Sequence, residues 1–241
     1  FKVTKVYHMV QFKDGSAYLL FNGCNWNCSF CVRKVGKWDF CLPDELKRVL
    51  DNLWSRGEVE FLSIEEVVEI LNENRVNLAF LGGGEPTVDG ELKSLVERLK
   101  KENIDVWLLT NGELLDEKLV DMVKGITFSI KALDDALHRR ITGVSNLNIL
   151  ENFRRFAGSG KIVAETVYAE NIVECDEILK IAKFIALVDP NIRFRIDPLV
   201  QNPVYSKVDE CIEKTKKILP NTYRIKANGG VETPKLLYPR L

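Results

Sequence analysis

The sequence lacks features that would each point to a class of partner or compartment. Its 34 Lys and Arg and 35 Asp and Glu leave a net charge of −1, so no basic surplus predicts a constitutive nucleic-acid partner or an anionic membrane. No apolar stretch reaches the length of a membrane span, and the opening FKVTKVYHMV lacks the layout of a signal peptide. We therefore expect a cytoplasmic protein.

Glutamine and repetitive sequence are also scarce. Gln11 and Gln201 are the only glutamines, while 29% of the residues are charged, a balance that predicts a thermophilic source. The chain contains no internal repeat and no low-complexity linker, and 241 residues suit one large core. We expect a single domain over residues 1–241, with a barrel at about 16–220 and a C-terminal tail at 221–241.

Strand-like and helix-like segments alternate along the chain. The hydrophobic runs that predict strands are 16–22, 78–81, 106–109, 126–130, 162–168 and 192–196. Helical periodicity is found at 43–54, 63–71, 91–100, 116–123, 147–156, 176–187 and 207–218, with Ser63 and Glu66 as a capping box and Asp89 as a candidate N-cap. Right-handed crossovers between parallel strands then predict an α/β fold, a partial (β/α)6 TIM-like barrel that binds ligands at the loops after its strands.

Three cysteines on one loop are the strongest chemical signal. Cys24, Cys28 and Cys31 form a C-x3-C-x2-C array directly after the first predicted strand. Three thiolates can hold three irons of a [4Fe–4S] cluster and leave the fourth iron open to a ligand. Zinc would need a fourth ligand, for which Cys41 or His8 is available, and inert buried cysteines are the simplest alternative.

A glycine-rich turn follows the next predicted strand. Gly82, Gly83 and Gly84 allow the backbone to approach a ligand closely, and Glu85 offers an acceptor for an ammonium group. Together the cysteine array and this turn resemble the radical S-adenosylmethionine (SAM) family of oxidoreductases.

The resemblance implies a [4Fe–4S] cluster and SAM as cofactors. It also implies an electron donor such as flavodoxin or ferredoxin. In the family, the open iron is chelated by the amino and carboxylate groups of SAM, and the Gly-Gly-Glu stretch, here Gly83 to Glu85, holds the methionine amine. Phe30 stands where the family places a residue that contacts the adenine. The cofactor performs the reaction in this family, so no protein side chain is predicted to be the reacting group.

Two later segments resemble a subgroup, the glycyl-radical-enzyme activating enzymes such as pyruvate formate-lyase activase. One is the stretch from Lys131 to Asn146, and the other is Thr110-Asn111-Gly112. The resemblance implies that Thr110 and Asn111 contribute to the SAM site and that Lys131 lies by the SAM carboxylate. It further implies a glycyl radical enzyme as the protein partner.

The sequence departs from that subgroup at the cation site. Such activases usually carry aspartates just before the Thr-Asn-Gly and two residues before the lysine, whereas this chain has Leu109 and Ser129 beside its SAM site. Glu165 stands where an arginine is common. These departures favour a small-molecule substrate, for example a pterin as in the carboxydeazaguanine synthases, and a non-catalytic metal-binding module is a third alternative. Asp197, after the sixth strand, either reaches the SAM ribose or substrate or only caps its loop.

The remaining cysteines and the two histidines have simple interpretations. Cys41, Cys175 and Cys211 are isolated in the sequence, so we expect incidental, reduced thiols rather than a second cluster or a disulfide scaffold. His8 and His138 are expected to be surface or structural residues.

Overall fold

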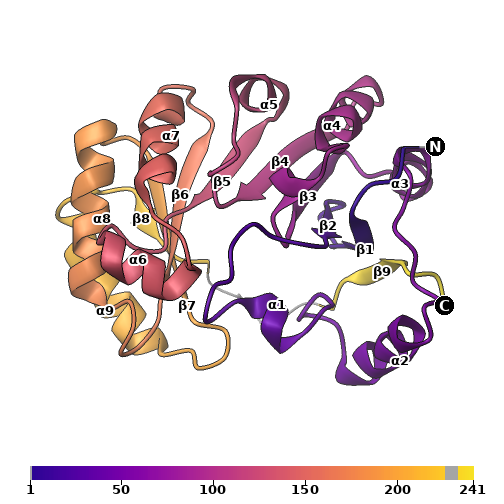
Figure 1. Ribbon diagram of the computed structural model, residues 1–241, viewed down its shortest axis with the longest axis horizontal. Coiled ribbons are helices and arrows are strands. Elements are labelled where there is room, and N and C mark those ends of the chain that lie inside the picture. Colours follow the sequence, from indigo (N-terminus) through magenta and orange to yellow (C-terminus); the bar gives the residue numbers. More distant parts are fainter. Residues whose placement is uncertain (1, 226–232) are drawn as a thin grey trace.

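A computed structural model describes residues 2–225 and 233–241 (Figure 1). Its sheet has nine strands in the order β8-β7-β6-β5-β4-β3-β2-β1-β9, and the run from β2 to β8 is parallel. The six predicted strands are all present, as β2 (Ala17–Phe21), β3 (Leu78–Gly83), β4 (Asp105–Thr110), β5 (Gly125–Ser129), β6 (Ile162–Tyr168) and β7 (Arg193–Pro198). The predicted α/β partial barrel is confirmed.

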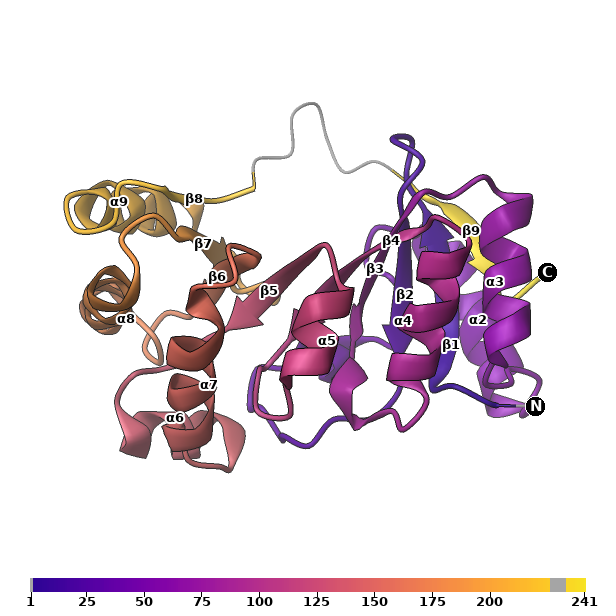
Figure 2. The ribbon, with the colours of Figure 1, turned by 90° about the horizontal axis from the view of Figure 1, so that it is seen from above.

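Helices connect the parallel strands, and most of them cover the outer face of the curved sheet (Figure 2). They are α2 (Asp44–Ser55), α3 (Ile64–Glu73), α4 (Leu92–Lys101), α5 (Glu117–Met122), α6 (Asp135–Thr142), α7 (Leu147–Ala157), α8 (Cys175–Val188) and α9 (Tyr205–Lys216). The one-turn helices α1 (Val32–Val35) and η1 (Pro86–Val88) lie in the loops after β2 and β3. These two short elements therefore belong to the ligand-binding edge of the sheet.

The predicted helix caps had mixed outcomes. Ser63 forms the expected capping box with Glu66, since its backbone N–H donates to Glu66 Oε2 at 2.8 Å and its hydroxyl accepts from the Glu66 backbone N–H. Asp89 is not the N-cap of α4, because the residue in that position is Glu91. The Asp89 carboxylate instead accepts hydrogen bonds from the backbone N–H groups of Glu91 and Lys5, at 2.9 and 2.6 Å. These bonds connect the N-terminal segment to the loop after β3.

Strands at the two ends of the chain were not predicted. β1 (Val6–Gln11) pairs antiparallel with β2, and β9 (Lys235–Tyr238) pairs antiparallel with β1, while the two-residue β8 (Thr222–Tyr223) continues the sheet beyond β7. The sheet therefore extends outside the predicted barrel range of 16–220. The described part of the predicted tail contributes two strands to it, β8 and β9.

The core has two parts that meet along the sheet. The larger cluster fills the space between the sheet and the outer helices, with Leu81, Leu108 and Phe128 on neighbouring strands fully buried. The smaller cluster lies where the loop from α1 to α2 covers β1 and β2, and its buried members are Tyr7, Val10, Leu20, Trp38, Leu42 and Leu50. This second cluster fixes the position of residues 37–54 beside the ligand-binding edge.

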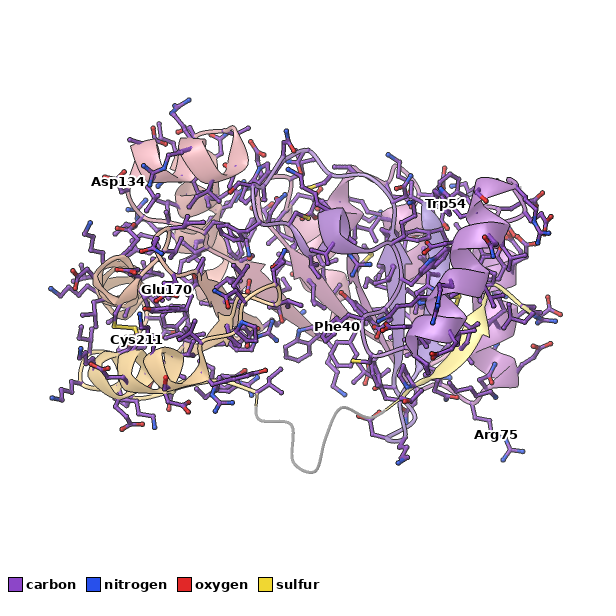
Figure 3. The ribbon with its side chains drawn as sticks, turned by 90° about the horizontal axis from the view of Figure 1, so that it is seen from below. Phe40, Trp54, Arg75, Asp134, Glu170 and Cys211 are labelled. Carbon is purple, nitrogen blue, oxygen red and sulfur yellow. A yellow bond between two sulfur atoms is a disulfide. The ribbon has the colours of Figure 1, made fainter. Side chains whose placement is uncertain are left out.

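The expectation that Cys175 and Cys211 are isolated thiols is wrong. Cys175 begins α8 and Cys211 lies on α9, and the two residues form a disulfide with a Cα–Cα distance of 5.4 Å (Figure 3). Thirty-six positions separate the two cysteines in the sequence, so only the packing of α8 against α9 brings them together. Cys41 has a free thiol, like the three cysteines of the array.

Candidate functional site

A cavity of about 680 Å³ opens at the ends of the parallel strands. Every residue that the sequence placed in a cofactor site lines it: Cys24, Cys28, Phe30, Cys31, Gly83, Gly84, Glu85, Thr110, Asn111, Ser129, Lys131 and Asp197. These residues come from the loops or ends of five strands, β2 to β5 and β7. The structure thus brings the predicted set together, while the role of each member stays a prediction.

Backbone hydrogen bonds to the end of α6 hold the cysteine loop. The N–H groups of Asn27 and Ser29 donate to the carbonyls of Thr142 and Ile141, at 3.0 and 2.8 Å. His138 on the same helix packs its ring against Trp26, with ring centroids 5.0 Å apart, as a buried structural histidine. The segment from Lys131 to Asn146, on which the subgroup resemblance depends, therefore supports the cysteine loop through hydrogen bonds and ring packing.

A second set of hydrogen bonds connects the cysteine loop to the loop after β4. Glu113 accepts from Trp26 Nε1 and from Asn25 Nδ2, both at 2.6 Å. Asn111 Nδ2 donates to Asn25 Oδ1 at 2.8 Å. Two loops that are far apart in sequence are thereby fixed to each other at the edge of the cavity.

The three thiols suit a cluster better than a single ion. Among the described residues, no group of three or more His, Cys, Asp or Glu side chains is arranged to hold a metal ion. Zinc requires four ligands at about 2.0–2.3 Å from one point, and neither Cys41 nor His8 is among the described residues that line the cavity. A four-iron cluster holds its cysteines around its own larger body, so three thiols that share one cavity fit it.

Burial and Lys131 have opposite effects on the pKa of Cys28, the middle thiol of the array. Burial raises the pKa of Cys28, and the positive charge of Lys131 lowers it. A cationic side chain beside the array stabilises the thiolate form that ligates iron.

The glycine turn is pressed against the first part of the cysteine loop. The backbone N–H groups of Gly84 and Glu85 donate to the carbonyls of Phe21 and Gly23, at 2.9 and 2.8 Å. A Cβ on Gly84 would lie 2.1 Å from the Gly23 oxygen, so only glycine fits there. The absence of side chains thus leaves the two motifs in direct backbone contact.

Glu85 is buried at the centre of a hydrogen-bond network. Its Oε1 accepts from the Thr87 N–H at 3.1 Å, the Thr87 hydroxyl at 2.6 Å and the Thr110 hydroxyl at 2.7 Å. Its Oε2 accepts from the Asn111 N–H at 2.7 Å. Burial raises the pKa of Glu85, and these donors oppose that effect. Oε2 has the capacity for a further donor, such as a ligand ammonium group.

Charged side chains form the floor of the cavity. Lys131 Nζ lies 3.5 Å from Glu165 Oε2, which also accepts a hydrogen bond from the Ser129 hydroxyl, and Arg195 Nε lies 2.8 Å from Asp197 Oδ2. Glu165 and Arg195 are opposite each other in the pairing of β6 with β7. Burial opposes the ionisation of Glu165, but Lys131 and Arg195 outweigh it and lower the pKa of that carboxyl.

Sequence reasoning missed several residues of the cavity wall. Arg195 went unnoticed, although its two-residue spacing from Asp197 on a strand puts both side chains on one face. Other unpredicted lining residues come from β1, β2, α1, α2 and the loop between the two helices, namely Tyr7, Tyr18, Arg33, Lys34, Lys37, Phe40 and Trp54. Nothing in the sequence pattern connects these residues to the cysteine array.

Comparison with known proteins gives consistent results. A family model for the radical SAM superfamily matches residues 18–185. The chain is 31% identical over 174 residues to a Methanocaldococcus jannaschii protein whose name assigns it provisionally to the glycyl-radical enzyme activating enzymes, a match that covers 70% of this chain and 62% of that protein. It is 34% identical over 127 residues to a 7-carboxy-7-deazaguanine synthase of Methanopyrus kandleri, covering 46% of this chain and 48% of that enzyme.

Among solved structures, Streptococcus suis SuiB bound to S-adenosylmethionine aligns with a TM-score of 0.60 at 16% identity, over 85% of this chain and 45% of SuiB. That likeness concerns the fold. The chain spans less than two thirds of the length of each of these three proteins. None of the helices in the described ranges is long and apolar enough to span a membrane.

Proposed function

Because the chain belongs to the radical SAM superfamily, we propose that it binds a [4Fe–4S] cluster and SAM in the cavity and removes a hydrogen atom from a substrate held beside them. The observation that carries this proposal is that the cysteine array and the glycine turn line the same cavity and are in direct contact. Three cysteines of one loop and the Gly83 to Glu85 turn line one cavity, and the Glu85 N–H bonds directly to the Gly23 carbonyl at 2.8 Å.

The proposal gives each predicted residue a role. Cys24, Cys28 and Cys31 hold the cluster. Once bound, cluster and SAM supply a one-electron reduction of the sulfonium and the radical that abstracts hydrogen. Glu85 Oε2 accepts the methionine ammonium group, since its other oxygen is already fully bonded.

The charged side chains at the floor of the cavity complete the proposed SAM site. Lys131 attracts the SAM carboxylate, and Glu165 holds the lysine in place from 3.5 Å. Asp197 and Ser129 face the same space, where they can accept hydrogen bonds from ribose or substrate hydroxyls. Phe30 supplies an apolar surface for the adenine.

Reductive SAM cleavage tests the proposal directly. The protein is reconstituted with iron and sulfide without oxygen, mixed with dithionite and SAM, and assayed for 5'-deoxyadenosine by chromatography. We expect product from the wild type, none from Cys28→Ala, and wild-type amounts from the matched control Cys41→Ala, whose thiol lies outside the array. Equal product from Cys28→Ala would refute the cluster assignment.

Two target classes are supported by different observations. A glycyl residue in a partner protein, which the sequence favours, is supported by the name of the Methanocaldococcus relative. The Lys131 to Asn146 segment supports it less, because its contacts to Asn27 and Ser29 already give it a structural role. A small molecule is supported by the missing aspartates at Leu109 and Ser129 and by the 7-carboxy-7-deazaguanine synthase relative.

Electron paramagnetic resonance separates the two targets. A glycyl target leaves a stable protein radical on a co-purified partner after turnover with SAM. If the target is a small molecule, no such signal appears, and the amount of 5'-deoxyadenosine rises only when that substrate is added.

A further inference from the structure

Three cationic side chains face the cavity from α1 and the loop after it. Arg33 and Lys34 lie on α1, and Lys37 follows two residues after the helix ends; we call these three residues the basic lip. The floor cations Lys131 and Arg195 are paired with Glu165 and Asp197. By contrast, no member of the basic lip forms an ion pair with a carboxylate anywhere in residues 2–225 or 233–241.

The backbone of the basic lip is held in place before any ligand arrives. The Lys37 carbonyl accepts from Arg33 Nη1 at 2.7 Å and from the Tyr7 hydroxyl at 2.5 Å. Trp38, the next residue, is buried and donates from Nε1 to Asp51 Oδ1 on α2 at 2.8 Å. Charges on a fixed backbone bind an anion without first ordering a loop.

Aromatic rings lie beside these charges. Lys37 Nζ is 5.8 Å from the centre of the Trp54 ring, which is itself half-buried against Tyr7 with ring centroids 5.4 Å apart. Phe40 also lines the cavity and is 55% exposed, and it lies between the two halves of the molecule in Figure 3. An exposed ring at the mouth of a cavity offers a flat apolar surface for stacking.

From this arrangement we propose that the basic lip, with Phe40 and Trp54, is the recognition site for a small, planar, anionic substrate. The inference rests on the proposed function and names the chemistry of its substrate. The ring of the substrate stacks on Phe40 or Trp54, and its carboxylate or phosphate is bound by Lys34 and Lys37, while Arg33 holds the loop. The five basic residues and three carboxylates that line the cavity give it a positive balance, which attracts such an anion.

Equilibrium dialysis with three probes tests the proposal. The probes are 2-naphthoate (ring and charge), 2-naphthamide (ring alone) and acetate (charge alone), each added to anaerobically reconstituted protein saturated with SAM. We expect one bound naphthoate per chain, naphthamide at least tenfold weaker and no measurable acetate. Lys34 and Lys37 are exposed, so water screens their charge-assisted hydrogen bonds. The double variant Lys34→Gln/Lys37→Gln should therefore weaken naphthoate about five- to tenfold and leave naphthamide unchanged.

Matched variants isolate the two parts of the site. Phe40→Ser should weaken naphthoate and naphthamide alike. Lys183→Gln, which removes one positive charge from the exposed side of α8 away from the cavity, should change neither. Equal affinity for naphthoate and naphthamide, an equal effect of Lys183→Gln, or no naphthoate binding at millimolar concentration would overturn the proposal.

An acidic peptide is the competing occupant. Binding of tetraglutamate in place of naphthoate would assign the basic lip to a protein target and refute the small-molecule inference. None of these measurements requires turnover. A failure of SAM cleavage is therefore recognised separately, in the 5'-deoxyadenosine assay.

Discussion

At the scale of single residues, Glu85 is more than a ligand acceptor. Its carboxylate joins η1 after β3 to the end of β4 through Thr87, Thr110 and the Asn111 backbone, all within 3.1 Å. Removing it leaves several buried donors without a partner. Glu85 therefore couples the stability of the loops to the affinity for the ligand.

We predict that Glu85→Ala weakens SAM binding about ten- to a hundredfold, the loss expected for a charge-assisted hydrogen bond of roughly 1.5–3 kcal/mol. Iron content should change little because Glu85 contacts no thiol. Equilibrium dialysis with SAM and iron analysis on the same samples check both statements. Unchanged SAM affinity would show that Glu85 acts only within the loops.

Asp197 has a pH-dependent effect on stability. Burial raises its pKa to about 6, while Arg195 opposes the shift and Glu165 reinforces it, with Lys131 as the other charge that faces it. The ordinary pKa of an aspartate is about 3.9, so between pH 4 and 6 the folded protein binds more protons at this site than the unfolded chain does. The contribution of Asp197 to stability is therefore greatest below pH 4 and falls as the pH rises through 6.

We predict that Asp197→Asn removes the pH-dependent contribution of this side chain to stability. The difference in the free energy of unfolding between wild type and variant should change steadily from pH 4 to 6 and be constant from pH 7 to 8. Urea unfolding at each pH measures it. A difference that is flat across pH 4 to 6 would contradict the raised pKa.

At the scale of elements, the turn after β3 depends on the absence of a side chain. A Cβ at Gly84 would lie 2.1 Å from the Gly23 oxygen, whereas a Cβ at Gly90, in the same loop, would meet nothing within 4 Å. We predict that Gly84→Ala lowers stability by about 1–3 kcal/mol and impairs cluster assembly, because the turn must move away from the cysteine loop. Gly90→Ala is the matched control and should resemble the wild type in thermal unfolding and in iron content.

The disulfide between α8 and α9 can be tested as a link between elements. For a closed loop of this size, with a sequence separation of 36, the chain-entropy model gives roughly 4 kcal/mol of stabilisation. We predict that Cys211→Ser lowers the free energy of unfolding by up to that amount, while Cys41→Ser has little effect. Alkylation of the unfolded, cluster-free protein should modify four cysteines without a reductant and six with one, as the four free thiols imply.

The elements that the sequence predicted well are those with a strong local pattern. The parallel strands are short, largely apolar runs, and the capping box of α3 depends on residues three apart, so local sequence sufficed. β1 was missed because VYHMVQ has a histidine at its centre and a polar end, yet His8 is fully buried. The disulfide depends on the packing of α8 against α9, which local sequence does not reveal, whereas the Arg195–Asp197 pair lies within one strand and could have been found from its two-residue spacing.

At the scale of the whole molecule, the same contrast applies to the candidate site. The cysteine array and the Gly-Gly-Glu turn were visible because their chemistry is encoded in consecutive residues. The basic lip and its aromatic neighbours come from α1, α2, the loop between these helices and β1, so no motif could identify them. The proposed substrate side of the cavity is thus formed by residues that only the tertiary fold brings together, whereas the proposed cofactor side is formed by short sequence motifs.

The pairing of β1 with β9 has a consequence for how the protein is made. β1 ends at Gln11 and β9 begins at Lys235, and the two strands are neighbours at the edge of the sheet (Figure 1). At about 5–20 residues per second, a ribosome needs roughly 10–45 s to travel between them. During that interval the outer edge of β1 has no neighbour and is open to pairing with other nascent chains. Synthesis of β9 supplies the missing partner strand and ends the interval in which this edge of β1 is exposed.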